Sequence, residues 1–275
     1  MPTASPRLSD AELLEALVDT ALRAGRVVLD VYHSAFAVEQ KGDSSPVTEA
    51  DKLAEVIILA DLARLAPGIP VVAEEACSAG MIPEVGATFF LVDPVDGTRE
   101  FISRNGDFTV NIGLIRDGTP VLGIVYAPVR RALYLGRLGA GAERLDVEDG
   151  RVTARQAIGV ASPCKVPPRI IASRSHRTSE TDAFIATHPG ASIVSAGSSL
   201  KFCLMAAGEA DLYPRMGPTM QWDTAAGDAV LRAAGGIVTE TDGQPLHYGP
   251  NGRAGVMAFA NPWFVAYGNP AGNPD

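Results

Sequence analysis

The feature that most constrains this fold is the segment Asp93-Pro-Val-Asp-Gly-Thr98, which follows directly on an apolar run from Thr88 to Val92. A short and continuously apolar run predicts a buried strand. Pro94 fixes one backbone angle behind that strand, and Gly97 permits a turn that other residues would resist. Two carboxylates of the segment can therefore face one point at the end of a buried strand.

Asp93 and Asp96 carry these two carboxylates. Carboxylates that are held close together repel each other unless a cation lies between them. Mg²⁺ is a hard cation that prefers such oxygen ligands. The plain alternative is a charged turn after a strand, but proline, glycine and threonine in this order favour a metal site.

Two further acidic positions stand at the boundaries of expected elements. Glu74-Glu75 follows a short strand expected at 71–73. Neighbours on an extended segment face opposite ways, so one of the pair points inward, unless the pair is a solvated loop end. Asp223 precedes a helix expected from Thr224, where it can cap the helix, ligate a metal, or do both.

Thr48 and Asp51 are spaced almost as in a capping box, at the start of another expected helix. Capping is the plain role for Asp51. The sharper hypothesis is that its carboxylate supports Thr98 from behind.

The second half of the chain supplies candidate cations in surroundings rich in glycine and serine, namely Arg174, His176, Lys201 and Arg215. Ser198 and Ser199 open an expected helix, whose free N–H groups would favour an anion. Each of these residues taken alone is more often a surface residue.

The remaining periodicity predicts a mixed α/β (α+β) chain. We expect helices at 9–34, 49–65, 180–187 and 224–234, and strands at 71–73, 88–92, 108–114, 120–126, 132–135, 170–172, 192–195 and 237–239. The second helix is expected to bury the face formed by Leu53, Val56, Ile57 and Ala60. Segment 39–48 is expected to be a polar loop, and segment 139–168 is rich in turn formers and charge. We place the domain boundary in the latter: 1–160 forms an α+β domain with an antiparallel sheet and the metal motifs, and 161–275 an α/β domain with the substrate-binding residues.

Composition limits the partners. The chain has 32 acidic and 23 basic residues and a formal net charge of −9, whereas proteins that bind a nucleic-acid polymer usually have a basic balance. Three cysteines, an odd count without zinc-finger spacing, argue against a disulfide framework. Residues 1–10 lack a secretory signal, and no apolar stretch reaches the ~20 residues of a spanning helix. We expect a cytoplasmic protein, and loose peripheral association with the inner membrane stays open.

Taken together, these motifs resemble the signatures of the inositol monophosphatase superfamily. The motifs, in chain order, are Ser45-Pro-Val-Thr-Glu-Ala-Asp51, Glu74-Glu75, Asp93-Pro-Val-Asp-Gly-Thr98 running on to Phe101, Trp222-Asp-Thr-Ala-Ala-Gly227 and Ala234-Gly-Gly236. The resemblance extends from about residue 11 to residue 262.

Within the superfamily, four segments are similar to the 3′(2′),5′-bisphosphate nucleotidase (CysQ) family. They are the run from Thr98 to Asn111, Ser173-Arg-Ser-His176, Gly197-Ser-Ser-Leu-Lys-Phe-Cys-Leu204 and Tyr213-Pro-Arg-Met-Gly-Pro-Thr219. Arg99 stands where members of that family often have lysine.

The resemblance implies a layered αβαβα sandwich of the inositol monophosphatase / fructose-1,6-bisphosphatase type. It implies two or three Mg²⁺ ions held by Glu74, Asp93, Asp96, Asp223 and the backbone carbonyl of Val95. The scissile phosphate would meet Gly97 and Thr98 beside these ligands, and the rest of the nucleotide would be bound by His176, Ser198, Lys201 and Arg215. The catalytic set would be Glu74, Thr98, Asp51 and Asp96, with Glu74 and Thr98 orienting a water and Asp51 polarising Thr98.

The implied reaction is removal of the 3′-phosphate of adenosine 3′,5′-bisphosphate to give AMP, inhibited by Li⁺, with the 3′-phosphosulfate donor as a second substrate. The partner would be a small nucleotide, and the protein a monomer or a homodimer. Two alternatives stay open. One is a phosphatase of the same superfamily that acts on inositol phosphate or fructose 1,6-bisphosphate, and the other is a non-catalytic sensor that keeps the fold.

Overall fold

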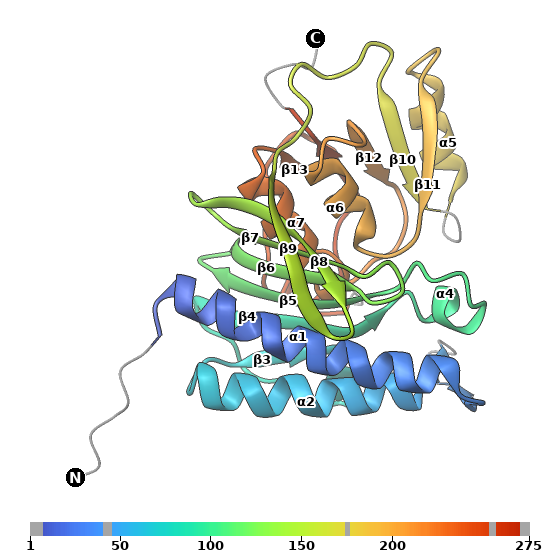
Figure 1. Cartoon of the computed structure of the whole chain (residues 1–275). Helices are drawn as coiled ribbons and strands as arrows, with labels where there is room; N and C mark the ends of the chain where they lie inside the picture. The colour runs from blue at the N-terminus through green and yellow to red at the C-terminus, as the bar shows by residue number, and fades with distance from the viewer. Residues whose placement is uncertain (1–7, 41–45, 174–176, 253–256, 270–275) are drawn as a thin grey trace.

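The computed structural model describes residues 8–40, 46–173, 177–252 and 257–269. Its elements form five layers in the order helix, sheet, helix, sheet, helix (Figure 1). Helices α1 (Asp10–His33) and α2 (Glu49–Leu65) cover one face of a seven-stranded sheet. Helices α6 (Leu200–Ala206) and α7 (Ala225–Ala233) separate that sheet from a five-stranded one, and α5 (Ser179–Ala186) lies on the outer side of the second sheet. The expected layered αβαβα sandwich is confirmed.

The first sheet has the strand order β3-β4-β5-β6-β7-β8-β9, in which β3 is parallel to β4 and each later pair is antiparallel. Its strands are β3 (Val71–Ala73), β4 (Thr88–Asp96), β5 (Thr109–Arg116), β6 (Thr119–Ala127), β7 (Ala132–Arg137), β8 (Gly141–Glu148) and β9 (Arg151–Ile158). The expected meander through β5, β6 and β7 is confirmed.

The second sheet has the order β11-β10-β12-β14-β13, with β10 parallel to both β11 and β12 and the remaining pairs antiparallel. Its strands are β10 (Arg169–Ser173), β11 (Ser192–Ala196), β12 (Leu212–Arg215), β13 (Ile237–Glu240) and β14 (Phe264–Tyr267). The remaining elements are short: β1 (Val38–Gln40), β2 (Pro46–Thr48), α3 (Glu74–Ser78), α4 (Thr98–Ile102) and η1 (Gln221–Asp223). The elements β12, β14, α3 and α4 were not predicted.

The expected loop at 39–48 is corrected, and the segment 139–168, expected to hold the domain junction, contains two strands that were not predicted. β1 and β2 pair as a two-stranded ribbon, and β8 and β9 form a hairpin that extends the first sheet beyond β7. β9 is largely exposed, so its charged residues hide the strand pattern while backbone pairing with β8 holds it in the sheet. Residues 159–168 then connect the two sheets. The boundary between 1–160 and 161–275 remains a prediction, since α6 and α7 lie between both sheets.

Both long helices begin where local capping predicts. Ser9 and Glu12 form a capping box at α1, and Thr48 and Asp51 form one at α2. In each, a side chain of the cap and one three residues later satisfy backbone N–H groups that have no partner within the helix.

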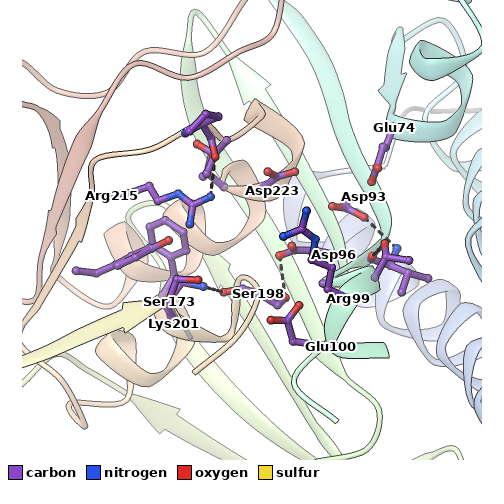
Figure 2. Close-up of a pocket in the computed structure, with 18 residues that line it drawn as sticks. Glu74, Asp93, Asp96, Arg99, Glu100, Ser173, Ser198, Lys201, Arg215 and Asp223 are labelled. Carbon is purple, nitrogen blue, oxygen red and sulfur yellow. Dashed lines mark hydrogen bonds between the residues drawn. The ribbon is translucent and has the colours of Figure 1, made fainter. Parts of the chain in front are cut away.

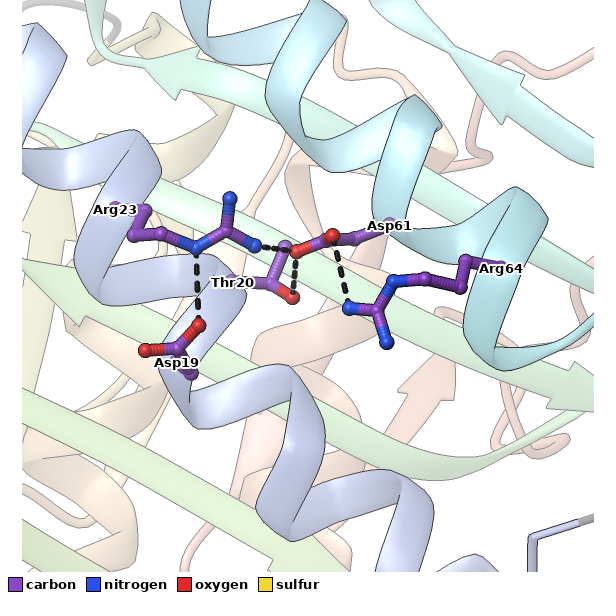
Figure 3. A network of polar contacts seen from close by, with 5 residues as sticks. All are labelled: Asp19, Thr20, Arg23, Asp61 and Arg64. Carbon is purple, nitrogen blue, oxygen red and sulfur yellow. Dashed lines mark hydrogen bonds and ion pairs between the residues drawn. The ribbon is translucent and has the colours of Figure 1, made fainter.

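The buried face of α2 differs from the prediction. Leu53 is 41% exposed and Val56 is 66% exposed, whereas the inner face combines small or apolar residues with acids: Ala50, Asp51, Ala54, Glu55, Ile58, Asp61 and Leu62. The error has a physical cause, because these buried acids have hydrogen-bond partners inside the protein. Asp61, for example, accepts from Thr20 on α1 and from two arginines (Figure 3).

Helix α7 lies very close to the first sheet. Gly113, Gly123 and Gly136 stand side by side on β5, β6 and β7 and leave a groove beneath it. A Cβ atom on Gly123 would lie 2.2 Å from the carbonyl oxygen of Ala226. Glycine is therefore required there for close packing. This packing brings the residues just before α7 to the end of β4.

All three cysteines are free thiols, as expected. Among the helices of the described residues, none combines the length and the apolar character that crossing a bilayer requires.

Candidate active site

The end of β4 forms one wall of a hollow of about 230 Å³. β4 is irregular between Asp93 and Asp96, where its register against β5 shifts. Asp93 Oδ1 accepts a hydrogen bond from the N–H of Val95 at 3.0 Å. Gly97 follows with φ of 93°, a left-handed conformation that favours glycine, and Thr98 begins α4. The predicted turn is confirmed, and β4 continues through the motif that was expected to follow it.

Glu74 reaches the same wall from the neighbouring strand. β3 pairs with β4 in parallel so that Ala73 lies opposite Val92, which sets Glu74 beside Asp93 (Figure 2). Burial raises the pKa of Asp93 well above its ordinary value, and the negative charges of Glu74 and Asp96 raise it further.

Asp223 arrives from the second half of the chain, in η1. Its carboxylate accepts from the N–H of Met220 at 2.9 Å. The predicted capping of the following helix is corrected, since the cap of α7 is Thr224, and Asp223 belongs to the turn before it. Burial, followed by the charges of Asp96 and Glu74, raises the pKa of Asp223.

The donor set fits Mg²⁺ in its chemistry. The four carboxylates of Glu74, Asp93, Asp96 and Asp223 line one hollow, and the charges of Glu74 and Asp96 disfavour ionisation of Asp93 and Asp223, an effect that a hard cation reverses. In the described part of the chain, no three acidic, histidine or cysteine side chains meet closely enough to share one ion. Asp96 points away from Asp93 and toward the second half of the chain (Figure 2).

Asp96 accepts three hydrogen bonds at its Oδ2 atom. The donors are Ser198 Oγ at 2.8 Å, the N–H of Ser199 at 2.6 Å and Asn111 Nδ2 at 3.2 Å. Asn111 Nδ2 also donates to Ser199 Oγ. The Ser199 hydroxyl in turn donates to the backbone carbonyl of Asp223 at 2.5 Å. The two acidic motifs are thus connected through Asn111 and Ser199 by a short chain of hydrogen bonds.

Both roles considered for Asp51 have a geometric basis. Its Oδ2 accepts from the N–H and hydroxyl of Thr48 at 2.8 and 2.7 Å. Thr98 Oγ1 lies 3.4 Å from Asp51 Oδ1 and 3.3 Å from the carbonyl oxygen of Val95. The single carboxylate of Asp51, which is fully buried, therefore caps α2 and also meets Thr98, the first residue of α4.

Two buried cations occupy the opposite wall. Lys201 Nζ donates to the carbonyl of Ser198 at 2.6 Å and lies 5.2 Å from the ring centroid of Tyr213. Arg215 Nη2 donates to the carbonyl of Pro218 at 2.6 Å, while its buried Nε has no hydrogen-bond partner among the described residues. Donors with capacity to spare suit an anionic ligand.

Arg174 and His176 lie outside the described residues. The hollow also includes residues that lie in the motif segments but were given no role in the site, namely Arg99, Glu100, Ser173, Phe202, Tyr213, Pro218, Thr219 and Thr224. Arg99 and Glu100 could have been predicted as site residues, because they directly follow Thr98 on the short α4. Phe202 and Tyr213 are buried, so they contribute to the core as well as to the wall of the hollow.

Comparison with known proteins gives a consistent family. The model described as "Inositol monophosphatase family" matches residues 9–265. The chain is 44% identical over 255 residues to the 3′(2′),5′-bisphosphate nucleotidase CysQ of Salmonella typhimurium, covering 92% of this chain and 98% of that protein. It is 42% identical to the CysQ nucleotidase of Escherichia coli K12 over the same shares of each chain.

Solved structures agree. CysQ from Bacteroides thetaiotaomicron, described as a bacterial member of the inositol monophosphatase family, superposes with a TM-score of 0.75 at 38% identity, covering 93% of this chain and 96% of that one. An IMPase from Thermotoga maritima has the same fold, with a TM-score of 0.73 at 23% identity over 93% and 91% of the two chains.

Proposed function

This chain belongs to the inositol monophosphatase family, and we propose that within it the protein is a magnesium-dependent 3′(2′),5′-bisphosphate nucleotidase. Its substrate is adenosine 3′,5′-bisphosphate, which loses its 3′-phosphate to give AMP, and the 3′-phosphosulfate donor is a second substrate. The observation that carries the proposal is a hollow in which four carboxylates face two buried cations. Relatives that are 42–44% identical and named as this nucleotidase support the choice of substrate.

The reaction transfers a phosphoryl group to water. A bond forms between phosphorus and the water oxygen, which gives up one proton, and the bond between phosphorus and the 3′-oxygen breaks. The 3′-oxygen takes up one proton and leaves as a hydroxyl, so the products are AMP and inorganic phosphate. Glu74 and Thr98 orient the attacking water. The Thr98 hydroxyl donates a hydrogen bond to Asp51, so its oxygen can accept a hydrogen bond from that water.

Two or three Mg²⁺ ions would be held by the carboxylates of Glu74, Asp93, Asp96 and Asp223 and by the backbone carbonyl of Val95. Magnesium, when bound, supplies positive charge that activates water and stabilises the negative charge of the transferring phosphoryl group. The N–H groups of Gly97 and Thr98 at the start of α4 face the scissile phosphate.

Ser198, Lys201, Arg215 and His176 bind the rest of the nucleotide and its 5′-phosphate. The hydrogen-bonding capacity left on Lys201 and Arg215 favours a doubly charged phosphate over a neutral hydroxyl group. Burial raises the pKa of the Cys203 thiol and keeps it protonated, so this thiol does not act as a nucleophile. We propose that the enzyme acts in the cytoplasm as a monomer or a homodimer.

The decisive experiment measures phosphate release from adenosine 3′,5′-bisphosphate, inositol 1-phosphate and fructose 1,6-bisphosphate, each with Mg²⁺ and with EDTA. We expect a strong preference for the bisphosphate nucleotide that is lost in EDTA. Preference for inositol or sugar phosphate would retain the metal chemistry and refute the assignment of Lys201 and Arg215. Absence of phosphate release from every substrate would favour a non-catalytic protein.

A further inference from the structure

Helix α3 begins with a site residue but has no capping side chain of its own. The residue before it is Ala73, which cannot accept a hydrogen bond through its side chain. Two backbone N–H groups of its first turn donate instead to one carboxylate on α2, that of Glu55. The distance is 2.9 Å from Glu75 N to Oε2 and 2.9 Å from Ala76 N to Oε1. These are the two positions that an N-cap side chain normally serves.

Glu55 belongs to the inner face of α2. It is 6% exposed and stands one helical turn after the fully buried Asp51, on the same side of the helix. Asp51 meets Thr98, and Glu55 meets the helix that begins with Glu74. Helix α2 therefore carries the side chain that meets Thr98 and the side chain that meets the start of α3, where Glu74 stands.

The local backbone by itself is weak support for Glu74. α3 has five residues, fewer than a helix needs to be stable alone. β3, which precedes it, has three residues and forms the edge of the sheet, paired with β4 on one side. A carboxylate that accepts both N–H groups fixes where α3 begins, and with it the position of its first residue.

We propose that Glu55 is a positioning residue for the phosphatase reaction: by capping α3 from α2, it holds Glu74 beside Asp93. The proposal rests on the proposed function, from which the role of Glu74 comes. A cap that served stability alone would change the unfolding temperature when removed and leave catalysis by the folded protein intact. A positioning residue changes catalysis and magnesium affinity as well.

The test compares Glu55→Ala and Glu55→Gln with a matched control, Asp61→Asn. Asp61 is also a buried acceptor on α2, at 7% exposed, but its partners lie in the contact between α1 and α2. For each full-length variant, kcat and KM are measured at 25 °C with adenosine 3′,5′-bisphosphate. Magnesium affinity is measured by calorimetry without substrate, and folding by circular dichroism and thermal melting.

We expect Glu55→Ala to lower kcat and to weaken magnesium binding by about 10-fold to 100-fold each, with KM for the nucleotide nearly unchanged. Glu55→Gln keeps one acceptor oxygen and should fall between the wild type and the alanine variant. Asp61→Asn should lower the melting temperature and leave kcat and magnesium affinity as in the wild type.

The proposal is overturned if folded Glu55→Gln and Glu55→Ala match the wild type in kcat and magnesium affinity, or if Asp61→Asn loses as much of both. Failure of the proposed function itself would look different, because the wild-type protein would then not hydrolyse the nucleotide. In that case the calorimetric comparison still decides whether Glu55 positions a magnesium ligand.

Discussion

Buried carboxylates lie in two regions of this protein that have opposite surroundings, the contact between α1 and α2 and the hollow at the end of β4. Between α1 and α2, the carboxylate of Asp61 accepts from the Thr20 hydroxyl at 2.6 Å and pairs with Arg23 and Arg64 (Figure 3). In the hollow at the end of β4, buried Asp93 has other carboxylates as its nearest charges (Figure 2). The first group is neutralised by the chain itself, and the second is not.

The surroundings of a buried acid separate a structural role from a functional one. A buried carboxylate with hydrogen-bond donors and a cation beside it is satisfied in the folded state. Carboxylates that raise one another's pKa oppose folding, and they persist where a ligand of opposite charge uses them. Asp211 belongs with Asp61: burial would raise its pKa, but hydrogen bonds and charge from Arg169 lower it below the ordinary value.

The largest effect is expected from a change among the carboxylates of the hollow. Asp96→Asn should lower kcat by about 10³-fold or more, since it removes several kcal/mol of charge stabilisation, and the fold should be unchanged. Phosphate release measures the first and circular dichroism the second. Activity like that of the wild type would refute the role of Asp96 as a magnesium ligand.

A smaller effect is expected on the wall that faces the carboxylates. Lys201→Met should lower kcat/KM for adenosine 3′,5′-bisphosphate by about 10-fold to 100-fold, the worth of a charge-assisted hydrogen bond. Adenosine 3′-monophosphate lacks the second phosphate and should be affected much less. Lys52→Met is the control, because Lys52 pairs with Glu39 at the surface, where its side chain is 52% exposed. Equal losses for both substrates would place Lys201 at the scissile phosphate instead.

Removing the Asp61 carboxylate from the contact between α1 and α2 should change stability and leave activity unchanged. Asp61→Ala should lower the free energy of unfolding by about 1–3 kcal/mol, since it leaves the buried Thr20 hydroxyl without its acceptor. Asp19→Ala is a milder control with an expected loss of about 0.5 kcal/mol, because the Asp19 side chain is 75% exposed. Urea unfolding measures both. A large loss of kcat at 25 °C in Asp61→Ala would contradict the separation of the two groups.

The two kinds of buried carboxylate should also differ in how they change stability with pH. The pKa values of Asp93 and Asp223 are raised on folding, so the folded protein binds protons more tightly than the unfolded chain, and in EDTA its stability should rise as pH falls from neutral toward the ordinary pKa of about 4. The pKa of Asp211 is lowered, so its contribution is fully present above the ordinary pKa and is lost as pH falls through the lowered one.

Thermal melting in EDTA between about pH 4 and pH 8 tests these signs. Asp223→Asn should show a smaller rise toward acid than the wild type, by up to about 1.4 kcal/mol per pH unit for each proton taken up. A wild-type stability that falls steadily from neutral pH would show that the site carboxylates do not oppose folding.

Much of the site could be predicted from short segments. The strand, proline and glycine around Asp93 already imply paired carboxylates, and the capping boxes at Ser9 and Thr48 set the starts of two helices. The acids at 74 and 223 could be named because each adjoins an expected element. Asn111 and Glu55 were missed, since a buried asparagine in a strand and a glutamate in a helix look ordinary in sequence.

The features that could be predicted from the sequence arise from interactions over a few residues, namely the helix starts and the turn at Gly97. The sequence also shows which types of residue are available to bind a metal. Tertiary structure alone decided which face of α2 is buried, because apolar residues occur on both sides and the buried acids find partners on α1 and α3. It also decided that Glu74, Asp96 and Asp223 share one hollow. That convergence depends on the parallel pairing of β3 with β4 and on glycines that let α7 approach the sheet, contacts between segments far apart in the chain, which no local pattern encodes.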